Sequence, residues 1–222
     1  MIRALLAACV AALVALPVGA VDIKEVTSPG GIRAWLVEEH SIPFTAIELR
    51  FEGGTSLDAP GKRGATLLMM ALLEEGSGDL DSQRFAEARE RLAASFEFDA
   101  YDDAATVSAK MLTENRDEAI ALLKQALTEP HFDDASITRV KGQVASIIRS
   151  DETDPNAIAS RAFDRLAFGD HPYGSSRFGT LDSLAALTRD DLVAAKEAVL
   201  ARDRLFVSAV GDITAEEFGV LL

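Results

Sequence analysis

The sequence predicts an α+β domain with a largely antiparallel sheet and with helices packed on one side of it. The chain has 222 residues, which one large domain can fill. Segments with alternating apolar residues come in neighbouring groups, and segments with helical periodicity come in blocks between them. The resulting order, βββααββαα followed by further helices and one more strand, is typical of an α+β domain.

Three predicted strands come first. Ile23 to Thr27 and Ile32 to Glu38 are joined by a Pro29-Gly30-Gly31 turn, which predicts a hairpin. Phe44 to Phe51 alternates apolar and polar residues, as a half-buried strand does. The turn-rich loop 53–63 then leads the chain into its next helix.

The segment from Gly64 to Leu73 predicts a short helix that is apolar on all sides. Such a helix is buried, and it is too short to cross a bilayer, which takes about 20 residues. Its burial must therefore come from the protein itself. The simplest interpretation is a core helix.

A second helix and another pair of strands are predicted next. Asp81 or Ser82 is the expected N-cap of the helix. Ser95 to Asp102 and Ala105 to Leu112 alternate apolar and polar residues. We expect two strands that meet at Asp102-Asp103.

The rest of the chain is predicted to be mainly helical. Caps and periodicity predict helices over 114–127, 136–149 and 155–168, a short turn after 180, a helix to about 200 and a last one from 214. Leu205 to Val210 is the final strand. The expected caps are Thr113, Asp154 followed by Pro155, Thr180, Thr188 and Thr214. Because the end of the sequence cuts the last helix short, a fragment or a truncated product is expected.

Residues 1–20 are predicted to be a secretory signal peptide. Arg3 supplies a positive start, Ala4 to Leu16 an apolar run, and Val18-Gly19-Ala20 a cleavage site of small residues. A membrane anchor is disfavoured because the run is short and an acidic, amphipathic chain follows. Cys9 resembles a lipoprotein acceptor, but too little hydrophobic sequence precedes it. We expect a mature chain that begins at Val21 and is secreted, into the bacterial periplasm.

Cysteine content and charge exclude several function classes. Cys9 is the only cysteine, so the cleaved chain has no disulfide and depends on its core. The formal net charge of −14 makes nucleic acid and anionic membrane surfaces poor partners. Solvated helix faces explain this acidity, and an acidic cavity for cationic peptides is the alternative. The sequence has no nucleotide-binding loop and no HxxEH, GxSxG or Cys-cluster motif.

Several short motifs are distributed along the chain in a distinctive order. They are Gly53-Gly54-Thr55-Ser56-Leu57-Asp58 before Gly61-Lys62-Arg63-Gly64, Phe98-Asp99-Ala100-Tyr101, Asp154-Pro155, His171-Pro172-Tyr173-Gly174 with Gly179-Thr180, and Val210-Gly211-Asp212. Each is weak alone, but the ordered set resembles the pitrilysin and insulinase family of zinc metallopeptidases. The resemblance implies that residues 21–222 are the N-terminal one of two similar halves, which family members join into a clam-shell around a peptide chamber. The second half is absent from this chain.

In active members of that family, the helix after this loop carries His-x-x-Glu-His, which binds zinc and activates a water. The resemblance places these positions on Leu67, Met70 and Ala71. It places the third ligand, a glutamate, near Ile147, or at Ser146 if the register shifts by one. Aliphatic side chains have no lone pair, and a thioether suits zinc badly and takes no proton. The resemblance therefore implies that the chain has no catalytic residues and no zinc.

Other candidate ligands are weaker. Glu74 and Glu75 lie beyond the helix face concerned. His40, His131 and His171 sit in separate loops without a partner four residues away, so turn packing is their simplest interpretation. The prediction is that the chain holds no metal and no cofactor.

The strand motif Asp99-Ala100-Tyr101 supplies the candidate substrate contacts. By the resemblance, it matches a place where active relatives have an Asn-Ala pair beside the substrate. The departure to Asp99 fits a cavity that is no longer used for cleavage.

The resemblance implies an exported, non-catalytic subunit that pairs with an active zinc peptidase of the same family around peptide substrates. Leu67, Leu68, Met70 and Ala71 are expected to present an apolar surface to the chamber, which the missing half or the active subunit covers. The alternative is a stand-alone periplasmic peptide-binding or scaffold protein. A third and least favoured hypothesis is an active peptidase with an unrecognised site. A neighbouring gene for an HxxEH relative would separate the first two.

Overall fold

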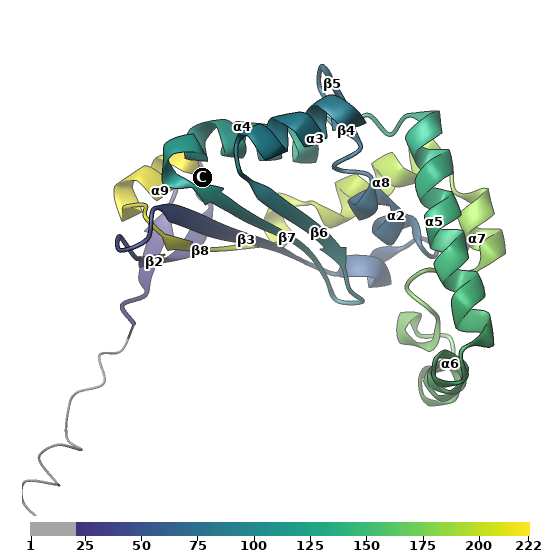
Figure 1. Ribbon diagram of the computed structural model, residues 1–222. Coiled ribbons are helices and arrows are strands. Elements are labelled where there is room, and N and C mark those ends of the chain that lie inside the picture. The colour runs from purple at the N-terminus through teal and green to yellow at the C-terminus, as the bar shows by residue number, and fades with distance from the viewer. Residues whose placement is uncertain (1–20) are drawn as a thin grey trace, which may run out of the picture.

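A six-stranded sheet organises residues 21–222, which are the residues that the computed structural model describes (Figure 1). The predicted signal peptide and Cys9 lie outside the described residues. The strand order is β1-β2-β8-β3-β7-β6, and all neighbours are antiparallel except β2 and β8. The strands are β1 Lys24–Thr27, β2 Arg33–Glu38, β3 Phe44–Glu52, β6 Ser95–Ala100, β7 Ala104–Leu112 and β8 Leu205–Gly211. The predicted α+β class and largely antiparallel sheet are confirmed.

Helices cover one face of the sheet and gather beyond its β6 edge. In Figure 1, α3, α4 and α9 lie above the strands, while α2, α5, α7 and α8 cluster at the right. No helix of the described part covers the lower face of β2, β8 and β3 in that view. The helices are α2 Ala65–Ala71, α3 Ser82–Arg91, α4 Arg116–Thr128, α5 Asp134–Thr153, α6 Pro155–Phe168, α7 Leu181–Ala186, α8 Arg189–Val199 and α9 Ala215–Leu221.

Short elements complete the chain, and the sequence patterns did not predict them. A two-stranded ribbon, β4 Gly76–Ser77 with β5 Leu80–Asp81, joins α2 to α3. Single 3-10 turns connect the larger elements. They are η1 Gly54–Leu57, η2 Thr113–Asn115, η3 Pro172–Gly174 and η4 Arg202–Arg204. None of the helices in residues 21–222 combines the length and the apolar character that crossing a membrane requires.

The side-chain caps explain why most helices begin where the sequence predicts. Asp81 accepts a hydrogen bond from the backbone N–H of Arg84, and Asp154 accepts two from Asn156 and Ala157. Thr180, Thr188 and Thr214 each form a capping box, so all five of these predicted caps are confirmed.

The predicted cap Thr113 is wrong. The helix α4 starts at Arg116, after the 3-10 turn, and its N-cap residue Asn115 makes no side-chain capping bond. The Thr113 hydroxyl instead donates to the Asp212 carboxylate at 2.9 Å. The Thr113 side chain thus contacts a residue from the far end of the chain, although the local sequence pattern predicted that it would cap the helix.

The core lies between the helices and the covered face of the sheet. Alternate strand residues such as Leu36, Ile47 and Val107 meet helix residues such as Leu68 and Phe85. This alternation is the pattern that predicted the strands. The opposite face of the sheet therefore carries the other half of each strand's side chains.

The helix α6 extends away from this core. It packs against α5 and the turn η3, and none of its residues is buried. Ile158, Phe163 and Leu166 are exposed along one side of it. An amphipathic helix thus has an apolar ridge that nothing in the described chain covers.

Candidate functional site

The helix α2 begins where the loop 53–63 ends, and Asp58 in that loop holds its first turn. The Asp58 carboxylate accepts hydrogen bonds from the backbone N–H groups of Gly64 and Thr66, at 2.8 and 2.9 Å. The Thr66 hydroxyl also donates to it, at 2.7 Å. First-turn N–H groups have no partner inside a helix, so this carboxylate supplies the acceptor that they need.

Glycine is the one residue type that fits at position 64, where the chain enters α2. Its φ is +101°, and a Cβ there would lie 2.7 Å from the carbonyl oxygen of Phe178. A side chain would meet backbone that cannot move aside. The loop containing Phe178 is therefore in direct contact with the start of α2.

The residues at the assigned zinc positions share one face of α2 but differ in burial. Met70 is 1% exposed and belongs to the core together with Leu68 and Met69. Leu67 and Ala71, one turn apart, are only partly buried. The prediction of burial on all sides is wrong at these two residues. The expectation that Leu68 and Met70 face a chamber is also wrong, because both side chains pack inward.

The third assigned position lies on the neighbouring helix. Ile147 and Ser146 are exposed on α5, which packs against α2. The Ser146 hydroxyl donates to the backbone oxygen of Gly142 at 2.9 Å, as helix-borne serines commonly do. Neither side chain carries the charge of the glutamate that the family resemblance places there.

The acidic residues after α2 are held in ion pairs. Arg89 lies 2.5 Å from the Glu74 carboxylate, and Arg139 pairs with Glu75. Within residues 21–222, no group of three or more His, Cys, Asp or Glu side chains is arranged to hold a metal ion.

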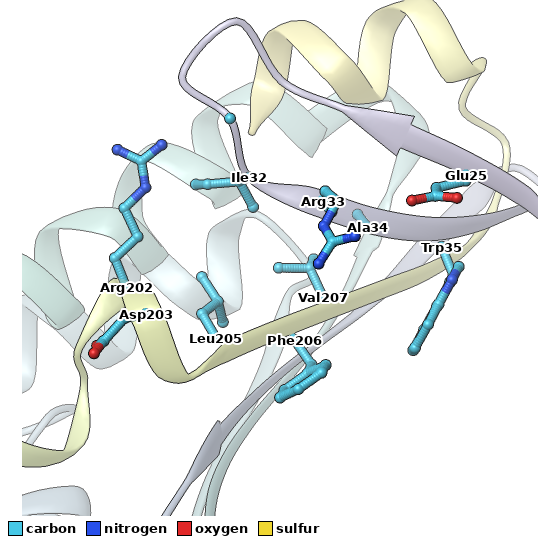
Figure 2. A pocket seen from close by; sticks show the side chains of 11 residues that line it. Glu25, Ile32, Arg33, Ala34, Trp35, Arg202, Asp203, Leu205, Phe206 and Val207 are labelled. Atoms are coloured by element: carbon cyan, nitrogen blue, oxygen red, sulfur yellow. The ribbon is translucent and has the colours of Figure 1, made fainter.

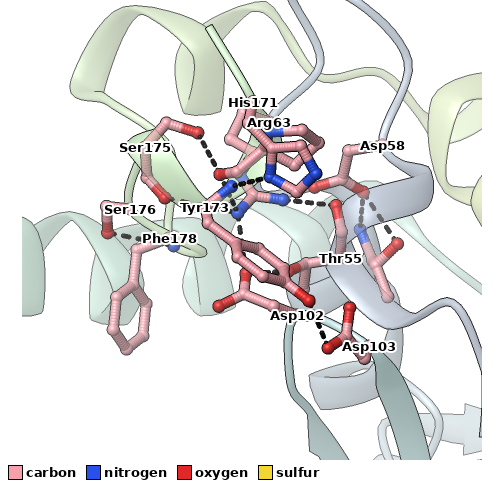
Figure 3. A network of polar contacts seen from close by, with 12 residues as sticks. Thr55, Asp58, Arg63, Asp102, Asp103, His171, Tyr173, Ser175, Ser176 and Phe178 are labelled. Carbon is pink, nitrogen blue, oxygen red and sulfur yellow. Dashed lines mark hydrogen bonds and ion pairs between the residues drawn. The ribbon is translucent and has the colours of Figure 1, made fainter. Parts of the chain in front are cut away.

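A polar network joins three loops beside α2 (Figure 3). The Arg63 guanidinium donates to the backbone oxygen of Thr55, to the Asp102 carboxylate at 2.8 Å and to the backbone oxygen of Pro172 at 3.0 Å. The Thr55 hydroxyl donates to the same carboxylate at 3.0 Å. One largely buried guanidinium therefore ties together the loop before α2, the β6–β7 turn and the loop after α6.

Tyr173 adds a second tie between the last two loops. Its hydroxyl donates to the Asp103 carboxylate, as Figure 3 shows. This hydrogen bond, together with burial and the negative charge of Asp103, raises the pKa of the Tyr173 hydroxyl. The tyrosine therefore stays neutral and keeps donating at physiological pH.

The candidate substrate contacts lie at the free edge of the sheet. In the described part of the chain, strand β6 has β7 on one side and no strand on the other. Asp99 is exposed on this edge and Ala100 is buried. Tyr101 follows the strand, and the Arg177 guanidinium lies 5.8 Å from the centre of its ring.

The three histidines make separate local contacts. The Nδ1 atom of His40 lies 2.7 Å from the Asp212 carboxylate, and this hydrogen bond raises the His40 pKa. The Nε2 atom of His131 lies 2.5 Å from the backbone oxygen of Gly78. The Nδ1 atom of His171 accepts from the backbone N–H of Tyr173. The structure does not bring these three residues together.

The sequence patterns predict no contact for three of these residues: Asp58 and Arg63 belong to motifs, and Asp102 belongs to the predicted turn between two strands. Their contacts explain the motifs: Asp58 starts α2, and Arg63 joins residues that are 39 and 109 positions away. The presence of an arginine directly before the glycine at the helix entry was the available signal. The pattern alone does not reveal the partners, because both lie in other loops.

The chain matches a known family over most of its length. Residues 33–181 match the family described as Insulinase (Peptidase family M16). A protein of Helicobacter pylori named Non-peptidase homolog YmxG is 29% identical over 180 residues, which are 81% of this chain and 42% of that protein. The Uncharacterized zinc protease YmxG of Bacillus subtilis is 22% identical and matches 86% of this chain and 47% of that protein. The chain thus spans about half the length of the curated relatives that it matches.

Solved structures share the fold. A peptidase M16 inactive domain from Pseudomonas fluorescens superposes with a TM-score of 0.86 at 26% identity, over 90% of this chain and 49% of that one. The periplasmic protease PqqL from Escherichia coli has a TM-score of 0.79 at 14% identity, over 93% of this chain and 24% of that one. Of these two structures, the one from Pseudomonas fluorescens is described as an inactive domain.

Proposed function

This chain belongs to the M16 family of insulinase-type peptidases, and on that premise we propose that it is a non-catalytic subunit that pairs with an active zinc peptidase of the same family. One observation carries the proposal. By the resemblance to the family, the positions that bear the zinc ligands and the general base in active members fall on Leu67, Met70 and Ala71, whose side chains cannot serve either role, and Met70 lies in the core. The similarity to a protein named a non-peptidase homolog and to a domain described as inactive supports it.

Pairing is part of the proposal because a peptide chamber needs a second wall. The fold is that of M16 domains, and the relatives carry about as much chain again beyond the matched part. An active partner would bring the metal and the general base, and this chain would shape the cavity through β6 and the loops that Arg63 joins. Peptides are the proposed substrates of the assembly.

The test is co-expression with a family member that carries HxxEH. The two proteins should elute together from a size-exclusion column, and the pair should cleave peptides. This chain alone should cleave no peptide and should hold no stoichiometric zinc. About one zinc per chain after mild chelation, or cleavage by the chain alone, would overturn the proposal.

A single reversion sharpens that test. Leu67→His should leave the isolated chain inactive, because a catalytic zinc site takes three protein ligands and a base together. Activity of this variant alone would show that the remaining site is already present.

Export is the second part of the proposal. The positive start, apolar run and small-residue site of residues 1–20 support removal of a signal peptide and a periplasmic location. Intact-mass spectrometry of the exported protein should give a chain that begins at Val21. A retained Met1 or a lipid on Cys9 would contradict this.

A further inference from the structure

The Arg177 guanidinium rests against two aromatic rings beside the end of β6. Its central carbon lies 5.8 Å from the centre of the Tyr101 ring and 5.3 Å from the centre of the Phe178 ring. Arg177 is exposed, and within residues 21–222 it forms no ion pair. Aromatic rings contact a guanidinium through its flat faces, so the N–H groups along its edge stay free. Such a cation can bind a carboxylate through two parallel hydrogen bonds.

The loop that carries Arg177 is held in place by other residues. The Arg63 guanidinium donates to the backbone oxygen of Pro172 at 3.0 Å, and the Tyr173 hydroxyl donates to the Asp103 carboxylate (Figure 3). These contacts do not involve Arg177, so the loop does not depend on this cation for its own structure. The guanidinium is therefore positioned in advance, and a ligand that binds it has little ordering entropy to overcome.

The two aspartates that follow Tyr101 are bound to other residues. Asp102 accepts a hydrogen bond from Arg63 at 2.8 Å, and Asp103 accepts one from a tyrosine hydroxyl. Neither carboxylate forms an ion pair with Arg177 in the part of the chain that the structure describes. In a chain with a formal net charge of −14, this exposed arginine has no carboxylate partner among many acids. It is therefore available to an anionic group of a ligand.

The position of Arg177 favours a peptide as the source of this anionic group. Tyr101 directly follows β6, an edge strand of the described sheet. The backbone N–H of Tyr101 donates to the backbone oxygen of Ala104 at 2.7 Å, so strand alternation directs the backbone groups of Phe98 and Ala100 to the free edge. An extended peptide can use these groups, and one of its carboxylates can then reach the Arg177 guanidinium.

We propose that Arg177 determines substrate specificity by binding a carboxylate of the peptide, with the Tyr101 ring as its support. This inference rests on the proposed function, because that function supplies the peptides. It adds the chemistry that distinguishes one peptide from another: a single acidic side chain, or a free C-terminal carboxylate, beside Arg177. Asp99 is exposed two residues before Tyr101 and disfavours peptides with several acids in a row.

The first experiment compares peptides that differ only in one carboxylate. The probes are labelled, otherwise neutral peptides of about six residues, the length of a typical strand. One set carries a single glutamate at each position in turn and an amidated C-terminus. The reference has glutamine instead, and a third probe is this glutamine peptide with a free C-terminus. Fluorescence anisotropy with the mature chain should give saturable binding that is about fivefold tighter for a carboxylate peptide at low salt, and the difference should shrink as salt is added.

The outcomes of this comparison identify the source of the carboxylate. Tighter binding of one glutamate peptide assigns an acidic side chain, and tighter binding of the free C-terminus assigns the terminal carboxylate. Equal binding of all the peptides, or no saturable binding of any, overturns the inference.

Arg33 supplies the matched control for Arg177. It is also exposed and without an ion pair in residues 21–222, but it lines a hollow of about 310 Å³ at the start of β2 (Figure 2). Arg177→Gln should abolish the preference for the carboxylate peptide and leave binding of the neutral peptide unchanged. Arg33→Gln should keep the preference. Far-UV circular dichroism and thermal melting establish that each variant is folded. Equal effects of the two substitutions would overturn the inference.

Two further changes test the sign of the charge and the role of the ring. Arg177→Glu should reverse the preference in favour of a peptide with lysine in place of the glutamate. Tyr101→Phe keeps the ring and should keep the preference, whereas Tyr101→Ala should weaken it because the guanidinium loses one of its two supports. A glutamate preference that survives Arg177→Glu contradicts the inference.

The assembly provides the last test and separates the inference from the proposed function. In the co-expressed pair, the ratio of kcat/KM between carboxylate and neutral peptides should fall to about one with Arg177→Gln and stay unchanged with Arg33→Gln. If the wild-type pair cleaves both kinds of peptide equally well, or if Arg177→Gln prevents co-elution, the assignment of Arg177 is wrong while pairing stands. If no pair forms with the wild-type chain while the anisotropy results hold, the proposed pairing fails and the carboxylate site stands.

Discussion

At the scale of single residues, Asp58 determines where α2 begins. It accepts two backbone N–H groups and one hydroxyl across the boundary between loop and helix. The sequence places an aspartate in the loop but does not reveal its hydrogen-bond donors, because they lie six and eight residues later, beyond the usual capping distance. The boundary of α2 therefore depends on the folded loop and not on a local cap.

Removal of this carboxylate tests that dependence. Asp58→Ala should lower the free energy of unfolding by about 1 to 3 kcal/mol, because it leaves first-turn N–H groups without an acceptor. Asp58→Asn should cost less, because its amide oxygen still accepts from Thr66. Urea unfolding followed by circular dichroism measures both. An alanine variant as stable as the wild type would show that water satisfies these groups.

His40 and Asp212 form a pair whose contribution to stability depends on pH. The hydrogen bond to Asp212 raises the His40 pKa above 6.5, and the same bond lowers the Asp212 pKa below 3.8. The histidine's contribution is present below pH 6.5 and is lost as pH rises through the raised pKa. The aspartate's contribution is present above pH 3.8 and is lost as pH falls through the lowered pKa. The pair therefore stabilises the fold between these limits.

Thermal melting from pH 4 to pH 9 should reveal this window. The melting temperature should decline above pH 6.5 as the pair loses its charge interaction. Both His40→Asn and Asp212→Asn should remove the part of this decline that comes from the pair. The effect should be small, because the pair is exposed to solvent. A wild-type-like pH profile in both variants would count against the pair.

At the scale of elements, the helix α2 shows which parts of the fold the sequence predicts. Its existence and its burial on one side follow from composition. Its partly exposed side at Leu67 and Ala71 does not, because a uniformly apolar helix has no pattern from which the outward face can be read. The caps at Asp81 and Asp154 were predictable because donor and acceptor are neighbours in sequence.

Charged substitutions at Met70 and at Leu67 should differ in their cost to stability, because the two residues differ in burial. Met70→Asp places a carboxylate in the core, where no cation can pair with it, and should lower the free energy of unfolding by several kcal/mol. Leu67→Asp places the carboxylate on the partly exposed side and should cost clearly less in the isolated chain. Guanidinium unfolding of both variants decides it. Equal losses would mean that Leu67 is as enclosed as Met70.

At the scale of the whole molecule, Arg63 holds together loops that are distant in sequence. Its side chain reaches Thr55, Asp102 and Pro172 from one position. The sequence does not reveal that these loops meet at the candidate site. The pattern predicted each loop, but it did not predict that one guanidinium joins them.

Removal of the Arg63 side chain should destabilise all three loops. Arg63→Ala should lower the free energy of unfolding by about 1 to 3 kcal/mol, because Asp102 and two backbone oxygens lose a charged donor. Arg63→Lys should recover little, because an ammonium cannot reach three acceptors in the same plane. Hydrogen exchange should rise around residues 55, 102 and 172 and stay unchanged in α9. A change confined to residues next to Arg63 would contradict the role as a tie.

The position of β8 has a consequence for the order of folding. Among the strands of residues 21–222 this one comes last in sequence, yet it lies between β2 and β3 and is the only one of them that joins the two. Until residue 211 is available, the β1–β2 hairpin and the β3-β7-β6 unit have no shared edge. A chain that emerges from its N-terminus therefore cannot complete this sheet before residue 211 has emerged. Sheet closure by a late, long-range strand pairing slows folding, so the chain stays incompletely folded while it emerges.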